Sequence, residues 1–270
     1  MMRIVSAIFL GLVLATAGHA AAVDGVDVYS LSEGQGPAIV LVHGWTCDTS
    51  AWTDQIEAFS DGYQVVALDL PGHGQSGAPA DERFTVDLYT GAIEAVITEL
   101  DLDRVVLIGH SMGVPVIAHY AARYPDRVMA MVAVDGPIAP PPPTEDGPSG
   151  PPAQNGISRE DSIRSFFVPQ TSAAVRTKVM NMMLAPSDER AAAILAPFFD
   201  PSFAFAEPPN VPILNVIAGN QPPLDPAVVQ SSPSNMQFVQ FEGTGHFLMM
   251  EQPERFNDLV RNFLENNLGP

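Results

Sequence analysis

Short apolar runs rich in β-branched residues alternate with longer amphipathic segments along residues 25–135. Ala38–Val42 (AIVLV) is a continuous run of this kind, and residues 63–70, 104–108 and 128–134 are similar. Such runs are typical of strands covered on both faces, and the segments between them are long enough to be crossover helices. The alternation predicts an α/β fold built on a mostly parallel sheet.

The same pattern returns near the C-terminus after an interruption. Residues 211–218 and Met236–Phe241 are predicted to be two further strands, and residues 253–267 a closing amphipathic helix. An earlier helix is predicted over residues 85–100, because one face carries Val86, Ala92, Ile93, Val96, Ile97 and Leu100.

The interruption, residues 137–210, differs in composition from the rest. Eight prolines fall in its first sixteen residues, which excludes a helix or central strand there and favours a stiff surface loop. Ser158 and Asp161 then form a capping-box pattern, and later prolines divide the rest of the segment into short helical pieces. We therefore expect a helical cap inserted between two parts of a catalytic α/β domain, residues 23–136 and 211–270.

The first residues predict an export signal rather than part of the fold. Arg3 gives a positive start, residues 4–17 form an apolar run, and residues 20–22 form an A-x-A-like exit. The run is shorter than the roughly 20 residues that a membrane span needs, so an uncleaved anchor is the less favoured alternative. We expect residues 1–22 to be removed and the mature protein to be periplasmic or extracellular, without stable membrane insertion.

Acidic side chains outnumber basic ones by 31 to 12, for a formal net charge of -19. Such a chain has no basic stripe to neutralise phosphates, which argues against nucleic acid or an anionic membrane as a partner. A single cysteine, Cys47, rules out an intramolecular disulfide and a cysteine-based zinc site. We expect neither a metal nor a cofactor, because no paired histidine or carboxylate spacing stands near the glycine-rich motifs of the chain. Nothing in the sequence indicates an oligomeric state.

Residues 109–113 (GHSMG) lie where a predicted strand passes into a helix. A G-x-S-x-G pattern in that position is typical of a nucleophile elbow, a strained turn that projects the serine Oγ above the sheet. Glycines flank the serine because a Cβ at either position would clash with the neighbouring strand or helix. The turn also places Ser111 at a helix N-terminus, which favours a developing oxyanion. A purely structural turn serine is the alternative.

A second motif, residues 43–45 (HGW), follows the first predicted strand. Its loop can direct a backbone N–H at the same developing charge, so we predict an oxyanion hole made by the amides of Trp45 and Met112. The Trp45 side chain would then be a pocket wall. His43 is better explained by a hydrogen bond to its loop than by proton transfer. The glycine-rich turn at residues 69–74 (DLPGHG) is expected to be structural.

A serine nucleophile is weak without a base, and the base is predicted to be a late histidine. His246 stands in GTGHF, between the last predicted strand and the closing helix. The other histidines lie in the signal, in the two turns, inside the elbow or in mid-helix. Position and elimination therefore favour His246.

The HGW turn, the DLPGHGQSG loop, the GHSMG elbow and the terminal GTGH followed by EQPERFNDLVRNFL together resemble the α/β-hydrolase superfamily of the capped, serine-dependent kind. The resemblance covers essentially the whole mature chain apart from the cap. It implies an eight-stranded, mostly parallel sheet, the chain order serine, acid, histidine, and hydrolysis through an acyl-enzyme. Ser111 argues against haloalkane dehalogenases and epoxide hydrolases, which use aspartate as the nucleophile.

The triad acid is the one departure from the pattern. Many relatives carry it after the seventh strand in a glycine-x-x-Asp arrangement, but here Gly219 is followed by residues 220–223 (NQPP). Two candidates remain: Asp135, at the end of the strand after the elbow helix, and Asp225, farther along the later loop. We favour Asp135 because a strand end positions a side chain more tightly than a proline-rich loop does. An aspartate at that position can also simply anchor the loop beneath the cap.

Many side chains of the cap, and those that follow His246, are apolar. They favour a substrate with an apolar acyl or alcohol part, although such residues more often belong to a protein core than to the wall of a ligand site. The cap residues concerned are Phe166, Phe167, Met180, Met182, Met183, Phe198, Phe199, Phe203 and Phe205. The predicted function is a serine hydrolase of small-molecule carboxylic esters. A hydrolase of a carbon-carbon, lactone or amide bond with the same triad is the first alternative, and a non-catalytic binding protein is the second.

Overall fold

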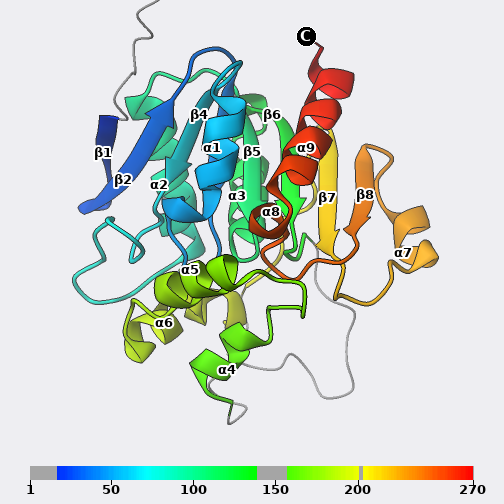
Figure 1. Cartoon of the computed structure of the whole chain (residues 1–270). Helices are drawn as coiled ribbons and strands as arrows, with labels where there is room; N and C mark the ends of the chain where they lie inside the picture. The colour runs from blue at the N-terminus through cyan, green and yellow to red at the C-terminus, as the bar shows by residue number, and fades with distance from the viewer. Residues whose placement is uncertain (1–16, 139–156, 201–202, 270) are drawn as a thin grey trace, which may run out of the picture.

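One sheet runs through the molecule (Figure 1). The computed structural model describes residues 17–138, 157–200 and 203–269. Within these residues eight strands lie in the order β1-β2-β4-β3-β5-β6-β7-β8. β2 runs antiparallel to both of its neighbours, and every neighbouring pair from β4 to β8 is parallel. The mostly parallel eight-stranded sheet expected from the sequence is confirmed.

The strands of the sheet are β1 (Ala17–Val23), β2 (Val26–Glu33), β3 (Ala38–Val42), β4 (Gln64–Leu68), β5 (Val105–His110), β6 (Val128–Val134), β7 (Ile213–Ala218) and β8 (Met236–Phe241). The helices are α1 (Thr53–Phe59), α2 (Val86–Glu99), α3 (Gly113–Arg123), α4 (Arg159–Arg164), α5 (Ala173–Met183), α6 (Asp188–Leu195), α7 (Pro226–Ser231), α8 (Leu248–Glu251) and α9 (Pro253–Leu268).

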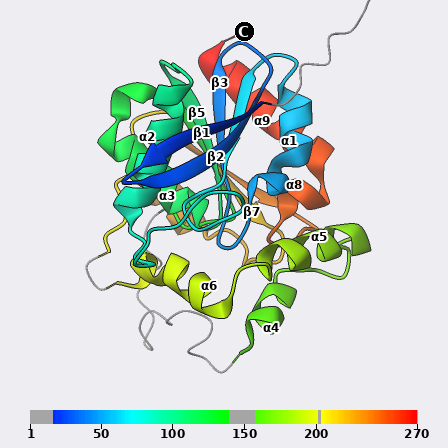
Figure 2. The same ribbon diagram turned by 90° about the vertical axis from the view of Figure 1, so that its left-hand side faces the viewer.

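Helices cover both faces of the sheet, which explains the continuous apolar runs. On β3, Val40 and Val42 belong to a buried cluster with residues of α2 and α3, whereas Ile39 and Leu41 belong to a second cluster with residues of α1 and α9. All four side chains are fully buried. Figure 2 shows the two helical layers on opposite sides of the strands. Successive residues of such a strand must both be apolar, because each points into a core.

The helices begin where their sequences predict. Thr85 caps α2 by accepting a hydrogen bond of 3.0 Å from the backbone N–H of Leu88. α9 begins at Pro253, whose fixed φ suits a first helical turn. Its inward face carries the expected periodic apolar residues, and the buried ones include Phe256, Val260, Phe263 and Leu264.

Among the described residues, the α-helices α4, α5 and α6 stand between β6 and β7 in the chain and lie together below the sheet in Figures 1 and 2. We refer to them and their connections, residues 157–200, as the cap. Ser158 caps α4, accepting from the backbone N–H of Asp161 at 3.0 Å. Most of the predicted proline-rich loop, residues 139–156, lies outside the described residues.

Residues 1–16 of the predicted export signal also lie outside the described residues. The remainder of that segment forms β1, antiparallel to β2 at the edge of the sheet. Cleavage after residue 22 would remove all of β1 except Val23, and the sheet would then begin with β2. In the described part of the chain, no helix is both long and apolar enough to cross a membrane.

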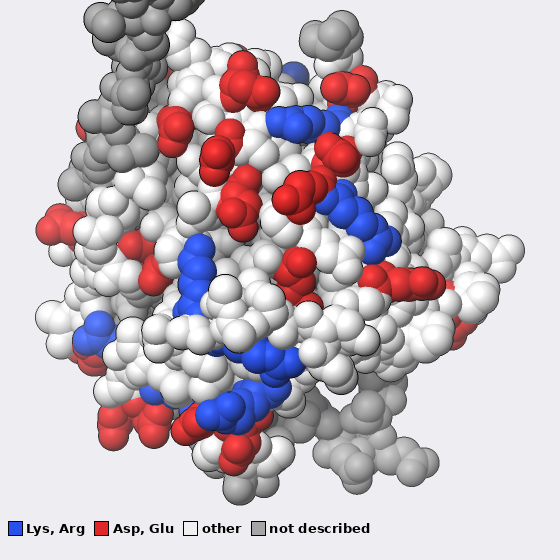
Figure 3. All heavy atoms as spheres, viewed as in Figure 1, with Lys and Arg blue, Asp and Glu red and all other residues white. Residues whose placement is uncertain are grey.

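Charged side chains of both signs are interspersed over the face seen in Figure 3. Several arginines are paired with acids, among them Arg127 with Glu94 at 3.2 Å and Arg190 with Glu82 at 2.5 Å.

Candidate active site

Ser111 occupies a strained turn between β5 and α3. Its φ is +52°, in the left-handed region that side chains other than glycine rarely adopt. A Cβ on Gly109 would lie 2.7 Å from the carbonyl oxygen of Gly113, and one on Gly113 would lie 2.5 Å from the carbonyl oxygen of Val42. The turn is therefore as tight as the predicted elbow requires, and both flanking positions demand glycine.

Asp135 follows β6 and points its carboxylate at His246. Its Oδ2 accepts a hydrogen bond of 2.6 Å from Nδ1 of His246, and its Oδ1 accepts one of 2.9 Å from the backbone N–H of Ala218. The side chains of Asp135 and His246 are 4% and 12% exposed. Because a carboxylate only accepts, Nδ1 carries the proton, and Nε2 of the neutral imidazole is the basic atom.

The other candidate acid, Asp225, is exposed and lies at the start of α7. Its side chain caps that helix, accepting from the backbone N–H of Ala227 at 2.8 Å. The loop before it packs against the His246 loop through its backbone: Asn220 N–H donates to the carbonyl of Thr244 at 3.1 Å. The structure thus brings Asp135, and not Asp225, to His246.

His110 connects Ser111 with the His246 loop, a role that the sequence pattern does not predict. Its Nε2–H donates to the carbonyl oxygen of His246 at 2.9 Å, and the two imidazole centroids lie 4.6 Å apart. Burial holds the pKa of His110 well below its usual range, so the ring is neutral. Among the described residues, no hydrogen bond joins Ser111 Oγ to His246 Nε2. In unliganded enzymes this contact is often long and tightens when substrate binds.

The HGW loop lies against the elbow. A Cβ on Gly44 would be 3.0 Å from Cβ of Ser111. The backbone N–H groups of Trp45 and Met112 donate to no acceptor within the described part of the chain. The two amides predicted to form an oxyanion hole are therefore available to a ligand beside Ser111.

His43 and Asp69 hold the two loops at this end of the sheet. His43 Nδ1–H donates to the carbonyl of Gly44 at 2.8 Å, and its Nε2 accepts from the backbone N–H of Leu70 at 3.0 Å. Desolvation by burial lowers the pKa of His43, which keeps the neutral tautomer that these two bonds need. The buried Asp69 carboxylate accepts from the backbone N–H of Thr49 at 2.7 Å. Both residues serve the loop structure, as the sequence predicts.

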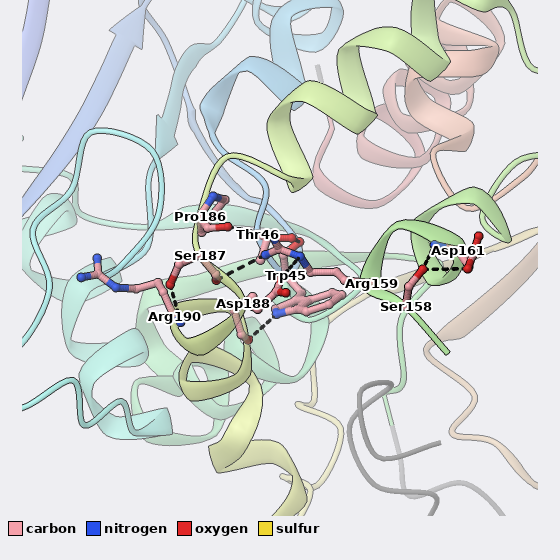
Figure 4. Close-up of polar contacts among 10 residues, drawn as sticks. Trp45, Thr46, Ser158, Arg159, Asp161, Pro186, Ser187, Asp188 and Arg190 are labelled. Atoms are coloured by element: carbon pink, nitrogen blue, oxygen red, sulfur yellow. Dashed lines mark hydrogen bonds and ion pairs between the residues drawn. The ribbon is translucent and has the colours of Figure 1, made fainter. Parts of the chain in front are cut away.

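The cap contacts both predicted catalytic loops. On one side, the indole N–H of Trp45 donates to the carbonyl of Ala191 in α6 at 2.7 Å. Figure 4 shows how the start of that helix is held: Arg159 of α4 donates to the carbonyl of Pro186 at 2.7 Å and pairs with Asp188 at 3.0 Å. The acceptor for Trp45 is thus on a helix that is itself tied to the rest of the cap.

On the other side, the cap reaches the base. The backbone N–H of His246 donates to the carbonyl of Phe166 at 2.9 Å, and the Phe166 ring lies 4.5 Å from the imidazole. Met182 and Met183 are buried in the cluster that also contains body residues such as Trp52. Phe198 packs on Tyr89 of the body. Of the predicted lining residues, Phe166 is placed directly beside the base.

A cavity of about 680 Å³ adjoins the HGW loop, between the body and the cap. Its walls include Thr46, Met182 and Ser187, but not Ser111. The volume falls in the range of small-molecule sites. Because Thr46 directly follows Trp45, the cavity borders the loop that carries a predicted oxyanion donor.

Comparison with known proteins identifies the fold. The model of the alpha/beta hydrolase fold family matches residues 37–151, which include the HGW loop and the elbow. The whole fold resembles a thermophilic esterase from Thermogutta terrifontis with a TM-score of 0.75, at 24% identity over 93% of this chain and 98% of that one. The chain has the α/β-hydrolase fold.

Two curated relatives are more similar in sequence over a shorter stretch. One is the non-heme chloroperoxidase CPO-A1 of Kitasatospora aureofaciens, 38% identical over 102 residues, or 37% of each chain. The other is the (E)-2-((N-methylformamido)methylene)succinate hydrolase of Acinetobacter baylyi, 42% identical over 104 residues, or 38% of this chain and 39% of that one. The matches span less than half the length of these relatives.

Proposed function

We propose that the chain is a serine hydrolase that cleaves carboxylic esters with an apolar acyl or alcohol part. The observation that carries the proposal is the hydrogen bond of 2.6 Å between Asp135 and His246, formed beside a serine held at a φ of +52°. A strained serine, an oriented histidine and a buried carboxylate at one edge of a sheet are the parts of a nucleophilic triad.

Acylation would begin when Ser111 Oγ attacks the ester carbonyl and His246 Nε2 takes its proton. Asp135 keeps the proton on Nδ1 and stabilises the imidazolium that forms. The amides of Trp45 and Met112 would receive the negative charge on the carbonyl oxygen. The bond between the carbonyl carbon and the alkoxide oxygen would then break, and His246 would give the proton to the alkoxide. The alcohol leaves, and the acyl group stays on Ser111 as an acyl-enzyme.

Deacylation would repeat these steps with water as the nucleophile. His246 Nε2 would take a proton from the water as it attacks the acyl carbonyl, and the same two amides would stabilise the second oxyanion. Return of the proton to Ser111 Oγ would release the carboxylic acid. Each residue is used twice in the same role, so no further group has to move.

The apolar surroundings of the base support an apolar substrate. Phe166 lies against the imidazole of His246, and Phe247 packs on His110 at a centroid distance of 4.9 Å. A low-dielectric surrounding strengthens the interactions that stabilise the developing charges. We further propose that the protein is exported to the periplasm or medium. Its partner would be a small-molecule substrate rather than nucleic acid or a membrane.

Hydrolysis of a carbon-carbon, lactone or amide bond is the second candidate. The Acinetobacter relative, named as a hydrolase of a methylformamido-methylene succinate, favours it, because that name describes an amide-bearing substrate rather than a simple ester. The same triad would serve either bond.

A panel of p-nitrophenyl esters of increasing acyl length, lactones, amides and diketones, assayed with the wild type and with Ser111→Ala, tests the proposal. We expect ester turnover that the substitution lowers by at least about 1,000-fold. Turnover of another class alone would favour the second candidate. A Ser111→Ala variant that keeps the wild-type rate would contradict both, and a folded wild type that turns over no substrate would favour the binding protein.

A further inference from the structure

Glu251 ends α8, yet its side chain returns to the loop that carries the base. Its Oε2 accepts a hydrogen bond of 3.0 Å from the backbone N–H of Gly245, the residue before His246. The same oxygen accepts a hydrogen bond of 3.0 Å from the hydroxyl of Thr171 in the cap. One carboxylate oxygen therefore joins the base loop to the cap.

Thr171 is itself held in a fixed orientation. It is 5% exposed, and its Oγ1 accepts from the backbone N–H of Val168 at 3.0 Å while its own N–H donates to the Val168 carbonyl at 3.0 Å. Arg176 donates to the Thr171 carbonyl at 3.0 Å and also to that of Val168. The hydroxyl proton points at Glu251, because a carboxylate oxygen can only accept.

The cap touches the same loop at a second point. The backbone N–H of His246 donates to the carbonyl of Phe166 at 2.9 Å. A Cβ on Gly245 would lie 2.2 Å from that carbonyl oxygen and 3.0 Å from Oε1 of Glu251. The Phe166 carbonyl and the Glu251 carboxylate therefore both occupy the space that a side chain at position 245 would need, and no larger residue fits there.

We propose that Glu251 is a positioning residue that holds the His246 loop against the cap, and so keeps the imidazole aligned with Asp135 and Ser111. The inference rests on the proposed function for its kinetic consequence. The bond to Asp135 orients the imidazole at its Nδ1 edge, but the direction of Nε2 also depends on the backbone that carries the ring. That backbone is fixed by Phe166, by His110 and, one residue earlier, by Glu251.

Enzyme kinetics on a p-nitrophenyl ester provide the first test. Glu251→Ala removes both hydrogen bonds, and we expect kcat to fall by about tenfold to 100-fold with KM unchanged, because a displacement of the base near 1 Å has an effect of this size. Glu251→Gln keeps an acceptor oxygen and should restore most of kcat. Glu254→Ala, which removes an exposed acid in the first turn of α9, is the matched control and should behave as wild type. A Glu251→Ala variant with wild-type kcat, or with raised KM alone, would overturn the proposal.

The link to the cap is tested by Thr171→Val, which removes the hydroxyl and keeps the side-chain volume. If the two residues act through one hydrogen bond, the effects of Thr171→Val and Glu251→Ala on kcat will not multiply in the double variant. Independent, multiplicative effects would contradict a role for the cap in holding the base.

A spectroscopic measurement tests the same claim without any substrate. The Nδ1 proton of His246, shared with Asp135, should give a resolved low-field proton resonance in the wild type and a broadened or lost one in Glu251→Ala. The Gly245 amide should exchange with solvent faster in that variant while the amides of β5 stay protected. Unchanged spectra would refute the inference, whereas a wild type with the resonance but no ester turnover would refute only the proposed function.

Discussion

Oδ2 of Asp135 lies 2.6 Å from Nδ1 of His246, although the two residues are 111 positions apart in the chain. The contact depends on β6 and β7 being neighbours: the backbone N–H of Asp135 donates to the carbonyl of Val216, and Oδ1 accepts from Ala218. Two backbone contacts with one strand thus aim the carboxylate. The proposed acid of the triad thus follows the sixth strand of the chain.

This geometry predicts different effects for the two candidate acids. Asp135→Asn should lower kcat for ester hydrolysis by about 10,000-fold, because an amide facing Nδ1 favours the wrong tautomer of His246. Asp225→Asn should leave kcat near the wild-type value, since asparagine can also cap α7. Steady-state kinetics of the two variants, side by side, check both. An inactive Asp225→Asn beside an active Asp135→Asn would assign the acid to the later loop.

Gly245 should not tolerate a side chain. A methyl group there would lie 2.2 Å from the Phe166 carbonyl oxygen, so Gly245→Ala must push the cap and the base loop apart. We expect a loss of about 1–3 kcal/mol in the free energy of unfolding, together with a fall in kcat. Gly62→Ala is the matched control, because no atom lies within 4 Å of its added Cβ. Equal behaviour of the two variants in urea unfolding and turnover would show that the close approach is not real.

The indole N–H of Trp45 should matter to the cap more than to the chemistry. Trp45→Phe removes the hydrogen bond to Ala191 but keeps the backbone amide that is proposed to bind the oxyanion. We expect kcat to stay within a few-fold of wild type and the free energy of unfolding to fall by about 1 kcal/mol. Limited proteolysis within the cap should be faster. A loss of kcat by several orders of magnitude would mean that the indole itself takes part in the reaction.

Three buried histidines predict how stability depends on pH. Burial lowers the pKa of His43, and holds those of His73 and His110 well below their usual range, so all three are neutral in the fold. Above pH 6.5 the unfolded chain is neutral at these positions too, and they have no effect on stability. Below pH 6.5 the unfolded state binds protons that the folded state does not, so stability falls as the pH falls toward the lowered values.

Each such histidine contributes a slope of at most about 1.4 kcal/mol per pH unit. Urea unfolding at pH 7.5, 6.5 and 5.5 measures it, and His73→Gln should flatten the curve by removing one titrating group. His73 is a suitable choice because it contacts neither Ser111 nor His246 in the hydrogen bonds and ring contacts of the described residues. Stability that is constant, or that rises, between pH 7.5 and 5.5 would show that these rings are not held neutral.

Much of the site could be predicted because its main residues sit in local motifs. Ser111 is defined by the glycines on either side of it, and each of them meets backbone within 3 Å when a Cβ is added. His246 stands in a glycine-bounded loop between a strand and a helix. Asp135 could be preferred to Asp225 on similar grounds, because a strand end has fewer conformations than a loop with prolines.

The residues proposed to hold the His246 loop could not be predicted, because their partners are distant in the chain. The carboxylate of Glu251 meets Thr171, 80 positions away, and nothing in the pattern of either segment signals that contact. The sequence feature that could have indicated the contact is the position of Glu251. It directly follows the apolar run FLMM, where a buried helix end would favour another apolar residue. The small apolar residues at the end of the predicted export signal are compatible with two structures. They suit both a cleavage site and the edge strand β1.

Ser111 should be an activated nucleophile, and covalent labelling can show this without any substrate. A fluorophosphonate probe should attach to the folded wild type, and peptide mass spectrometry should place the label on Ser111. Ser111→Ala should not be labelled, and His246→Ala should be labelled much more slowly, because the serine then lacks its base. A folded wild type that takes up no probe, or a Ser111→Ala variant labelled at the wild-type rate, would contradict the account.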